Sequence, residues 1–144
     1  MSLLIKRILS SIKNIYEKID TVNEKIRDSG WQTAVLTEDF KPYSNDNSNM
    51  PRYRKIGKIV HVRGTVSPSL TIEGGMETHT IFNLPNGYIP SSTSSFLCQG
   101  SGLRRWLLTI TTNGNVTFSR YGTEAYVDAD DGAWLPFTVT FFVD

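Results

Sequence analysis

The sequence predicts a mainly β protein, with an antiparallel β-sandwich or jelly-roll-like head preceded by an N-terminal α-helix that forms a trimeric coiled coil. Near the N-terminus, apolar residues recur at alternating spacings of three and four, which is the heptad pattern of a coiled coil. After Gly30 this period ends and short period-two segments follow. An Asn113-Gly114 pair between two such segments indicates a hairpin. We therefore expect residues 1–29 to form an oligomerising stalk and residues 30–144 to form the head.

The N-terminal helix is expected to run from about Leu3 to Asp28 and to end at Ser29-Gly30, because glycine accepts the left-handed conformation of a helix cap. Isoleucine at both core positions of the heptad shifts the preference from two strands to three or four, and we expect a trimer. The alternatives are an amphipathic helix packed on its own domain and a helix on a membrane surface. The apolar stripe, called the isoleucine seam below, consists of Ile5, Ile8, Ile12, Ile15, Ile19, Val22 and Ile26.

Composition narrows the classes of function. The 144 residues suit one compact domain plus the stalk. Residues 29–144 hold nine basic and ten acidic side chains, which argues against a nucleic-acid-binding protein. The single cysteine, Cys98, excludes an intrachain disulfide, and no apolar run is long enough to span a membrane. A local basic cluster is interpreted as the solvated face of a strand and consists of Arg52, Arg54, Lys55 and Lys58.

Period-two segments predict the main strands of the head. Residues 55–66 alternate apolar and polar side chains, as a half-buried antiparallel strand does. Residues 106–111 and 116–121 flank Asn113-Gly114, where both turn positions are expected to have positive φ. In the last segment, 135–143, Phe142 breaks the alternation, and one interpretation places it against a neighbouring subunit. Shorter strands are predicted at 33–37, 70–72, 78–83 and 95–99, and a mobile loop is predicted at 43–50.

Several segments, taken in order, carry a family resemblance. They begin near Trp31 and continue through residues 53–64 (YRKIGKIVHVRG), 84–91 (LPNGYIPS), the Asn113-Gly114 hairpin and residues 132–137 (GAWLPF). Over about residues 31–144 the sequence resembles the C-terminal head domains of tail-fibre, baseplate and receptor-binding proteins of phages and prophages of Gram-positive hosts. The resemblance implies a β-sandwich head on a trimeric stem that adheres to cell-surface saccharide.

The resemblance also implies a location and partners. We expect a homotrimer in the virion tail, assembled in the host cytoplasm, whose N-terminal helix docks on other phage tail or baseplate structural proteins. Its heads would bind host cell-wall saccharide, and three identical heads would convert weak single-site affinity into avidity. The alternative is a structural virion decoration, collar or tail accessory protein without a specific ligand.

Three loop segments combine aromatic and planar polar side chains, which together suit a saccharide site. They are residues 121–134, 99–106 and 88–95, and loops on a rigid sheet are the usual location for binding. The candidate ligand-binding residues are Arg104, Tyr126, Asp128, Asp130 and Trp134.

These candidates have structural alternatives. Trp106 and Trp134 begin apolar strands, so packing in the core is the favoured role for both, and Tyr88 is expected to pack in a turn. Arg104 or Arg105 would equally suit an intersubunit ion pair with Asp128 or Asp130. The 128–131 run invites a calcium site, but it lacks the ligand spacing of an EF-hand loop, so a solvated turn is favoured.

Catalysis finds little support in the sequence. His61 and His79 lie in no nucleophile or zinc motif, and no phosphate-binding glycine loop is present. Glu73 and Glu77 flank a Gly-Gly turn, and a carboxylate pair for glycoside hydrolysis is the remaining enzymatic hypothesis. We expect no enzymatic activity, no cofactor and no metal.

Overall fold

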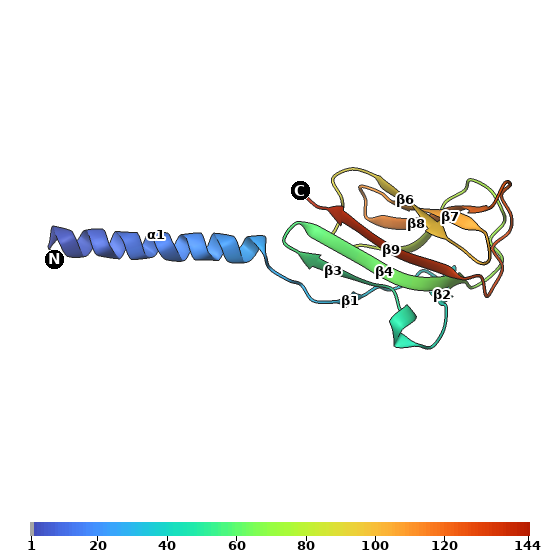
Figure 1. Cartoon of the computed structure of the whole chain (residues 1–144), viewed down its shortest axis with the longest axis horizontal. Coiled ribbons are helices and arrows are strands. Elements are labelled where there is room, and N and C mark those ends of the chain that lie inside the picture. Colours follow the sequence, from blue (N-terminus) through green and yellow to red (C-terminus); the bar gives the residue numbers. More distant parts are fainter. Residues whose placement is uncertain (1) are drawn as a thin grey trace.

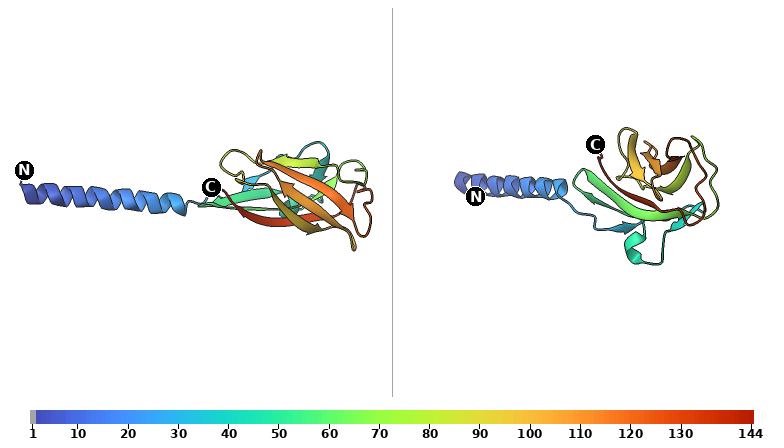
Figure 2. Two further views of the ribbon diagram at one scale, coloured as in Figure 1. Left: turned by 90° about the horizontal axis from the view of Figure 1, so that it is seen from above. Right: turned by 45° about the vertical axis from the view of Figure 1, so that its right-hand side comes forward.

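One long helix projects from a head built of two antiparallel sheets (Figure 1). This computed structural model describes residues 2–144. The helix, α1 (Leu3–Lys25), leads away from the head, so that the N-terminus lies at the far end of the molecule. The C-terminus lies at the end of the head that faces the helix. Two further views show that the helix does not fold back over either sheet (Figure 2).

Helix α1 begins with a side-chain cap and ends three residues earlier than the sequence predicted. The Oγ atom of Ser2 accepts a hydrogen bond from the backbone N–H of Ile5 at 3.2 Å. The last helical residue is Lys25 rather than Asp28, because the following residues pair with the head. Asp28 forms a β-bridge with Ile56, and the N–H of Ser29 donates to the carbonyl of Lys55 at 2.8 Å. The chain therefore leaves the helix to join a sheet edge.

The first sheet, sheet A, is organised around the long strand β4 (Ile59–Pro68). Its strands β3 (Arg52–Ile56) and β2 (Phe40–Pro42) pair with successive parts of one edge of β4, and β9 (Leu135–Phe142) pairs with the other edge. The short strand β1 (Gln32–Thr33) extends the sheet beyond β3. Sheet A therefore has five strands, and the turn between β3 and β4 lies beside the end of α1, where the N–H of Gly57 donates to the carbonyl of Arg27 at 3.0 Å.

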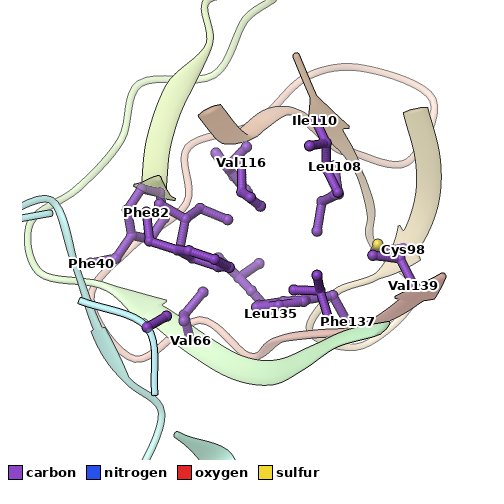
Figure 3. Packing of buried hydrophobic residues seen from close by; sticks show 14 of the residues in the cluster. Phe40, Val66, Phe82, Cys98, Leu108, Ile110, Val116, Leu135, Phe137 and Val139 are labelled. Carbon is purple, nitrogen blue, oxygen red and sulfur yellow. The ribbon is translucent and has the colours of Figure 1, made fainter. Parts of the chain in front are cut away.

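The second sheet, sheet B, has the strand order β5-β8-β7-β6. Its members are β5 (His79–Asn83), β6 (Ser94–Gln99), β7 (Arg105–Ile110) and β8 (Asn115–Gly122). The core lies between the two sheets, where labelled side chains from both layers meet (Figure 3). Trp106 is fully buried there, and its ring lies 6.1 Å from that of Phe137 in an edge-to-face arrangement. The mainly β architecture predicted from the sequence is confirmed.

The predicted strand 55–66 is wrong in its first part. Ile56 and Ile59 face each other across a tight turn at Gly57-Lys58, so the segment belongs to two strands of a hairpin. Gly57 supplies the turn with a φ of +59°, a conformation that other residues adopt at a cost. From Val60 onward the alternation holds, and Val60, Val62 and Val66 are fully buried.

The Asn113-Gly114 hairpin is confirmed between β7 and β8, but its turn differs from the expected type. Only Gly114 has positive φ, at +87°. The N–H of Gly114 donates to the carbonyl of Thr111 at 2.9 Å, and the N–H of Thr111 donates to the carbonyl of Asn115 at 3.0 Å. The connection is therefore a three-residue loop that ends in a left-handed glycine, which is a common hairpin form.

The shorter predictions have mixed outcomes. Strands at 78–83 and 95–99 correspond to β5 and β6, whereas the segment at 33–37 is reduced to β1 and one bridge at Leu36. Residues 70–72 form no strand, and Ile72 makes a single bridge with Ala129. The loop predicted at 43–50 contains a 3-10 turn, η1 (Asn47–Asn49), capped by Asp46. Strand β2 was not predicted.

Candidate functional site

Three loops meet at the end of the head opposite α1 (Figures 1 and 2). They are residues 69–78, 100–104 and 123–134, and together they are called the tip surface below. Ile72 and Ala129 exchange two backbone hydrogen bonds, each of 2.9 Å, which joins the first loop to the third. The N–H of Trp134 donates to Oγ of Ser101 at 2.8 Å, which joins the third loop to the second. The segments nominated around Arg104 and around residues 126–134 are therefore brought together.

The aspartates of the tip surface hold its loops in place. Asp128 accepts a hydrogen bond from the N–H of Gly74 at 2.8 Å, and Asp130 accepts one from Oγ1 of Thr71 at 3.1 Å. Asp131 forms an ion pair with Lys41 of β2. All three carboxylates remain exposed, so each keeps lone pairs that face solvent. They can orient a ligand hydroxyl, but they already have structural partners.

The aromatic residues of the tip surface have different roles. Trp106 is buried as predicted, and its ring N–H donates to the carbonyl of Gln99 at 2.8 Å. The favoured core position for Trp134 is wrong, because this side chain is 39% exposed. Its strand becomes buried only at Leu135, one residue later. Tyr126 is 48% exposed, so two aromatic side chains of the tip surface face solvent.

The remaining nominated side chains are placed as follows. The guanidinium of Arg104 lies 5.8 Å from the ring centre of the buried Tyr121, which fixes it against the head. Arg105 is exposed at the start of β7. Tyr88 lies at the opposite end of the head and packs edge-to-face on Tyr53 at 5.0 Å, in agreement with the predicted turn-packing role. The 88–95 loop is therefore not part of the tip surface.

The described residues offer no arrangement for metal binding. Within residues 2–144, no three His, Cys, Asp or Glu side chains are placed to hold one ion. Glu73 and Glu77 are both exposed. Within the same residues, no helix has the length and apolar character needed to cross a membrane.

A second group of clustered aromatic and basic side chains lies on the outer face of sheet A and was not predicted from the sequence. The ring of Trp31 lies 5.5 Å from the guanidinium of Arg52, 5.7 Å from that of Arg54 and 5.9 Å from that of Arg63. His61 contacts the same ring edge-to-face at 5.8 Å. These five residues are called the Trp31 cluster. Its members come from β3, β4 and the segment before β1.

The interpretation that the basic residues between Arg52 and Lys58 form one solvated face is wrong. Arg52 and Arg54 are half-buried beside Trp31, on the outer face of β3. Lys55 points to the other face, where its ammonium lies 5.8 Å from the ring centre of Tyr88. The hairpin turn separates Lys58 from this group and leaves it exposed.

The charges of the Trp31 cluster are only partly balanced. Arg54 donates two hydrogen bonds to Asp28, one of them at 2.8 Å, and this contact together with the Gly30 N–H lowers the pKa of Asp28 to about 2. Arg52 and Arg63 form no ion pair with the described residues, and the buried Nε of Arg52 has no hydrogen-bond partner among them. His61 bonds Oγ1 of Thr140 at 2.8 Å, and burial and then Arg63 lower its pKa.

The isoleucine seam of α1 is uncovered along its whole length. No residue of the helix is buried, and the seven seam side chains are between 43% and 63% exposed. Beside the end of the helix, Ile56, Ile59 and Phe142 are also exposed on the outer face of sheet A. They border a groove of about 710 Å³ that the last turn of α1 also lines.

The fold is that of phage receptor-binding heads. The head domain of phage bIL170, described among the receptor-binding domains of lactococcal phages, matches with a TM-score of 0.56 and 13% identity, over 79% of this chain and 97% of that chain. The receptor-binding protein of Listeria phage PSA matches with a TM-score of 0.53 and 12% identity, over 94% of this chain and 80% of that chain. Neither a protein-family model nor a curated protein matches the sequence. The family resemblance seen in the sequence is therefore supported at the level of the fold.

Proposed function

We propose that this protein is a homotrimeric phage tail or baseplate receptor-binding protein that adheres to a host cell-surface saccharide without catalysing a reaction. The observation that carries the proposal is the combination of a receptor-binding head fold with a projecting helix whose apolar seam is uncovered. An apolar heptad seam of this kind is stabilised when copies of the helix pack together. Residues 1–29 act as the stalk and residues 30–144 as the head.

The polarity of the molecule supports this role. The stalk and the tip surface lie at opposite ends, so a virion attached through the N-terminal helix would present the tip surface outward. The residues proposed to contact saccharide there are Tyr126 and Trp134, which expose aromatic faces, with Arg104, Asp128 and Asp130 as polar neighbours. A trimer holds three such surfaces at a fixed spacing and gains avidity for a repetitive polymer.

Adhesion is tested with the intact, fluorescently labelled protein on host cells. We expect labelling that purified cell-wall polysaccharide competes away, and we expect Tyr126→Ala with Trp134→Ala to weaken it. The matched control is Tyr43→Ala, which removes an exposed aromatic ring outside the tip surface. A protein that labels no susceptible cell, or whose labelling the polysaccharide does not compete, would instead be a structural decoration of the virion.

A further inference from the structure

We propose that the Trp31 cluster binds the oxyanion of a negatively charged saccharide, a phosphate or carboxylate group carried on a sugar ring. This site lies on the outer face of sheet A, away from the tip surface, and it does not depend on which end of the molecule meets a cell. It adds a ligand class, an acidic sugar, to the adhesive role proposed above.

The first reason is an unbalanced concentration of positive charge. Three guanidinium groups lie within 6 Å of the centre of one indole ring. Among residues 2–144, the one carboxylate that forms an ion pair with them belongs to Asp28, and it is already shared between Arg54 and the N–H of Gly30. Arg52 and Arg63 therefore retain donors for an anion, and guanidinium forks match the geometry of phosphate and carboxylate.

The second reason is the relative position of these two arginines. Arg52 and Arg63 are direct partners across the antiparallel β3–β4 pair. Like charges in directly opposed positions are destabilising, so a sheet that contains this pair gains stability when an anion lies between them. The buried Nε of Arg52 has no hydrogen-bond acceptor among the described residues, so the protein does not balance this guanidinium group through Nε.

The third reason is a hollow of suitable size and character beside the charges. It measures about 410 Å³ and is lined by Trp31, Arg54, Ile56, Ile59 and His61. The ring of Trp31 and the two isoleucines offer an apolar wall for the C–H face of a sugar. His61 and Arg54 offer polar groups to its hydroxyls. Arg52 and Arg63 contact the ring of Trp31 but do not line the hollow, so the sugar ring would occupy the hollow and the attached oxyanion would lie beside it, at these two arginines.

Direct titration of the intact protein tests the site with defined probes. Glucose 1-phosphate and glucuronate carry the two candidate oxyanions, glucose carries none, and inorganic phosphate carries no sugar. Calorimetry and tryptophan fluorescence would measure each affinity, and we expect at least one charged sugar to bind about tenfold or more tightly than glucose and inorganic phosphate. The charged probe that binds more tightly identifies the oxyanion. Equal affinity for glucose would overturn the anion site, and equal affinity for inorganic phosphate would overturn the saccharide part.

The paired variant Arg52→Gln with Arg63→Gln removes the two free guanidiniums. We expect it to lose at least about tenfold in affinity for the charged sugar. The matched control is Lys6→Gln with Arg7→Gln, which removes two exposed charges from non-seam positions of α1. Unchanged affinity of the Arg52/Arg63 variant would overturn the proposal.

Thermal unfolding shows whether the paired variant keeps its fold. Because a ligand that binds only the folded state raises the unfolding temperature, the charged sugar should stabilise the wild type and the control but not the Arg52/Arg63 variant. Without ligand, the variant should unfold at a temperature no lower than the wild type, because a repulsive pair has been removed. If no probe binds and the variant alters the oligomer mass, this surface is a contact between subunits and the proposal is wrong. If the titrations show no binding at the Trp31 cluster, the adhesion of the protein to cells is unaffected. If the protein does not adhere to cells, the titrations are unaffected, so the two proposals fail independently.

Discussion

Replacing three residues in the middle of the isoleucine seam with aspartate should convert the proposed trimer to monomers. The change is Ile12→Asp, Ile15→Asp and Ile19→Asp, and these side chains are 43%, 56% and 48% exposed in the single chain. Burying a whole isoleucine contributes about 1.5–3 kcal/mol, so covering the exposed half of each contributes about 1 kcal/mol. The triple variant would therefore lose about 3 kcal/mol of association free energy per chain.

The introduced charges add a larger penalty. A carboxylate that is desolvated without a partner costs several kcal/mol, and a trimer would bring the same charges of three chains together. Most of the stability of a helix in a protein comes from packing of its amphipathic face, so the dissociated 23-residue stalk should lose helical content. The head, whose core contains none of these residues, should keep its fold.

Size-exclusion chromatography with light scattering measures the outcome. The wild type should have about three times the 16.2 kDa chain mass, and the seam variant should have the mass of one chain. The matched control replaces outward-facing polar residues, Ser10→Asp, Asn14→Asp and Thr21→Asp, and should remain a trimer. A seam variant that keeps the trimer mass would show that the head alone drives assembly, and a monomeric wild type would refute self-association of the seam.

Three further predictions concern the fold of the head and the ion pair that joins it to the stalk. Gly114→Ala should lower the free energy of unfolding by about 1–3 kcal/mol in thermal or urea denaturation, because φ is +87° and a Cβ atom would lie 2.8 Å from the carbonyl oxygen of Leu84. Trp106→Ala should cost about 3–5 kcal/mol in the same assay, because it empties the fully buried centre of the core. Asp28 should titrate with a pKa of about 2 by NMR, and Arg54→Gln should return it toward 3.8. Because the folded pKa is lowered, the stabilisation from this pair is complete above about pH 4 and is lost as the pH falls toward 2, and an unchanged pKa in the variant would contradict it.

The sequence predicts those strands whose side chains alternate between core and solvent. In β9, Leu135, Phe137, Val139 and Phe141 are buried, and the exposed Phe142 is the residue that breaks the pattern. Its contact with a neighbouring subunit stays a prediction. By contrast, β2 has three residues and its position depends on pairing with the distant end of β4, so no local period indicates it.

The Trp31 cluster was not predicted because the alternation of residues 55–66 continues across the turn at Gly57-Lys58 and so conceals it. If residues 55–66 were one strand, an upstream extension would put Arg52 and Arg54 on the same face as Val60, opposite His61 and Arg63. The turn at residues 57–58 reverses the chain and pairs Arg54 with His61 and Arg52 with Arg63. Even-numbered residues of β3 and odd-numbered residues of β4 then lie on the same face of the sheet. A test for turn-forming glycine within an alternating segment would have found this signal at Gly57.

The residue types of the tip surface could be read from the sequence, but the contacts that those residues make could not. Aspartates on a glycine-containing loop can bind ligands or hold a loop, and their partners decide between these roles. Asp128 contacts Gly74, which lies 54 residues earlier in the chain, and no local pattern predicts that contact. The exposure of Trp134 similarly depends on where β9 enters the core.

In the proposed trimer, the affinity of one binding site differs from the avidity of the three sites together. If each of three heads loses tenfold in affinity and all three engage a polymer together, the losses multiply to about a thousandfold in avidity. A single-site change in the Trp31 cluster should therefore appear much larger in adhesion to cells than in titration with a small sugar. The seam variant should show the opposite pattern, because it keeps the affinity of each head and loses the linkage between heads. Comparing the two readouts for the same variants distinguishes a residue that contacts ligand from one that holds the proposed trimer together.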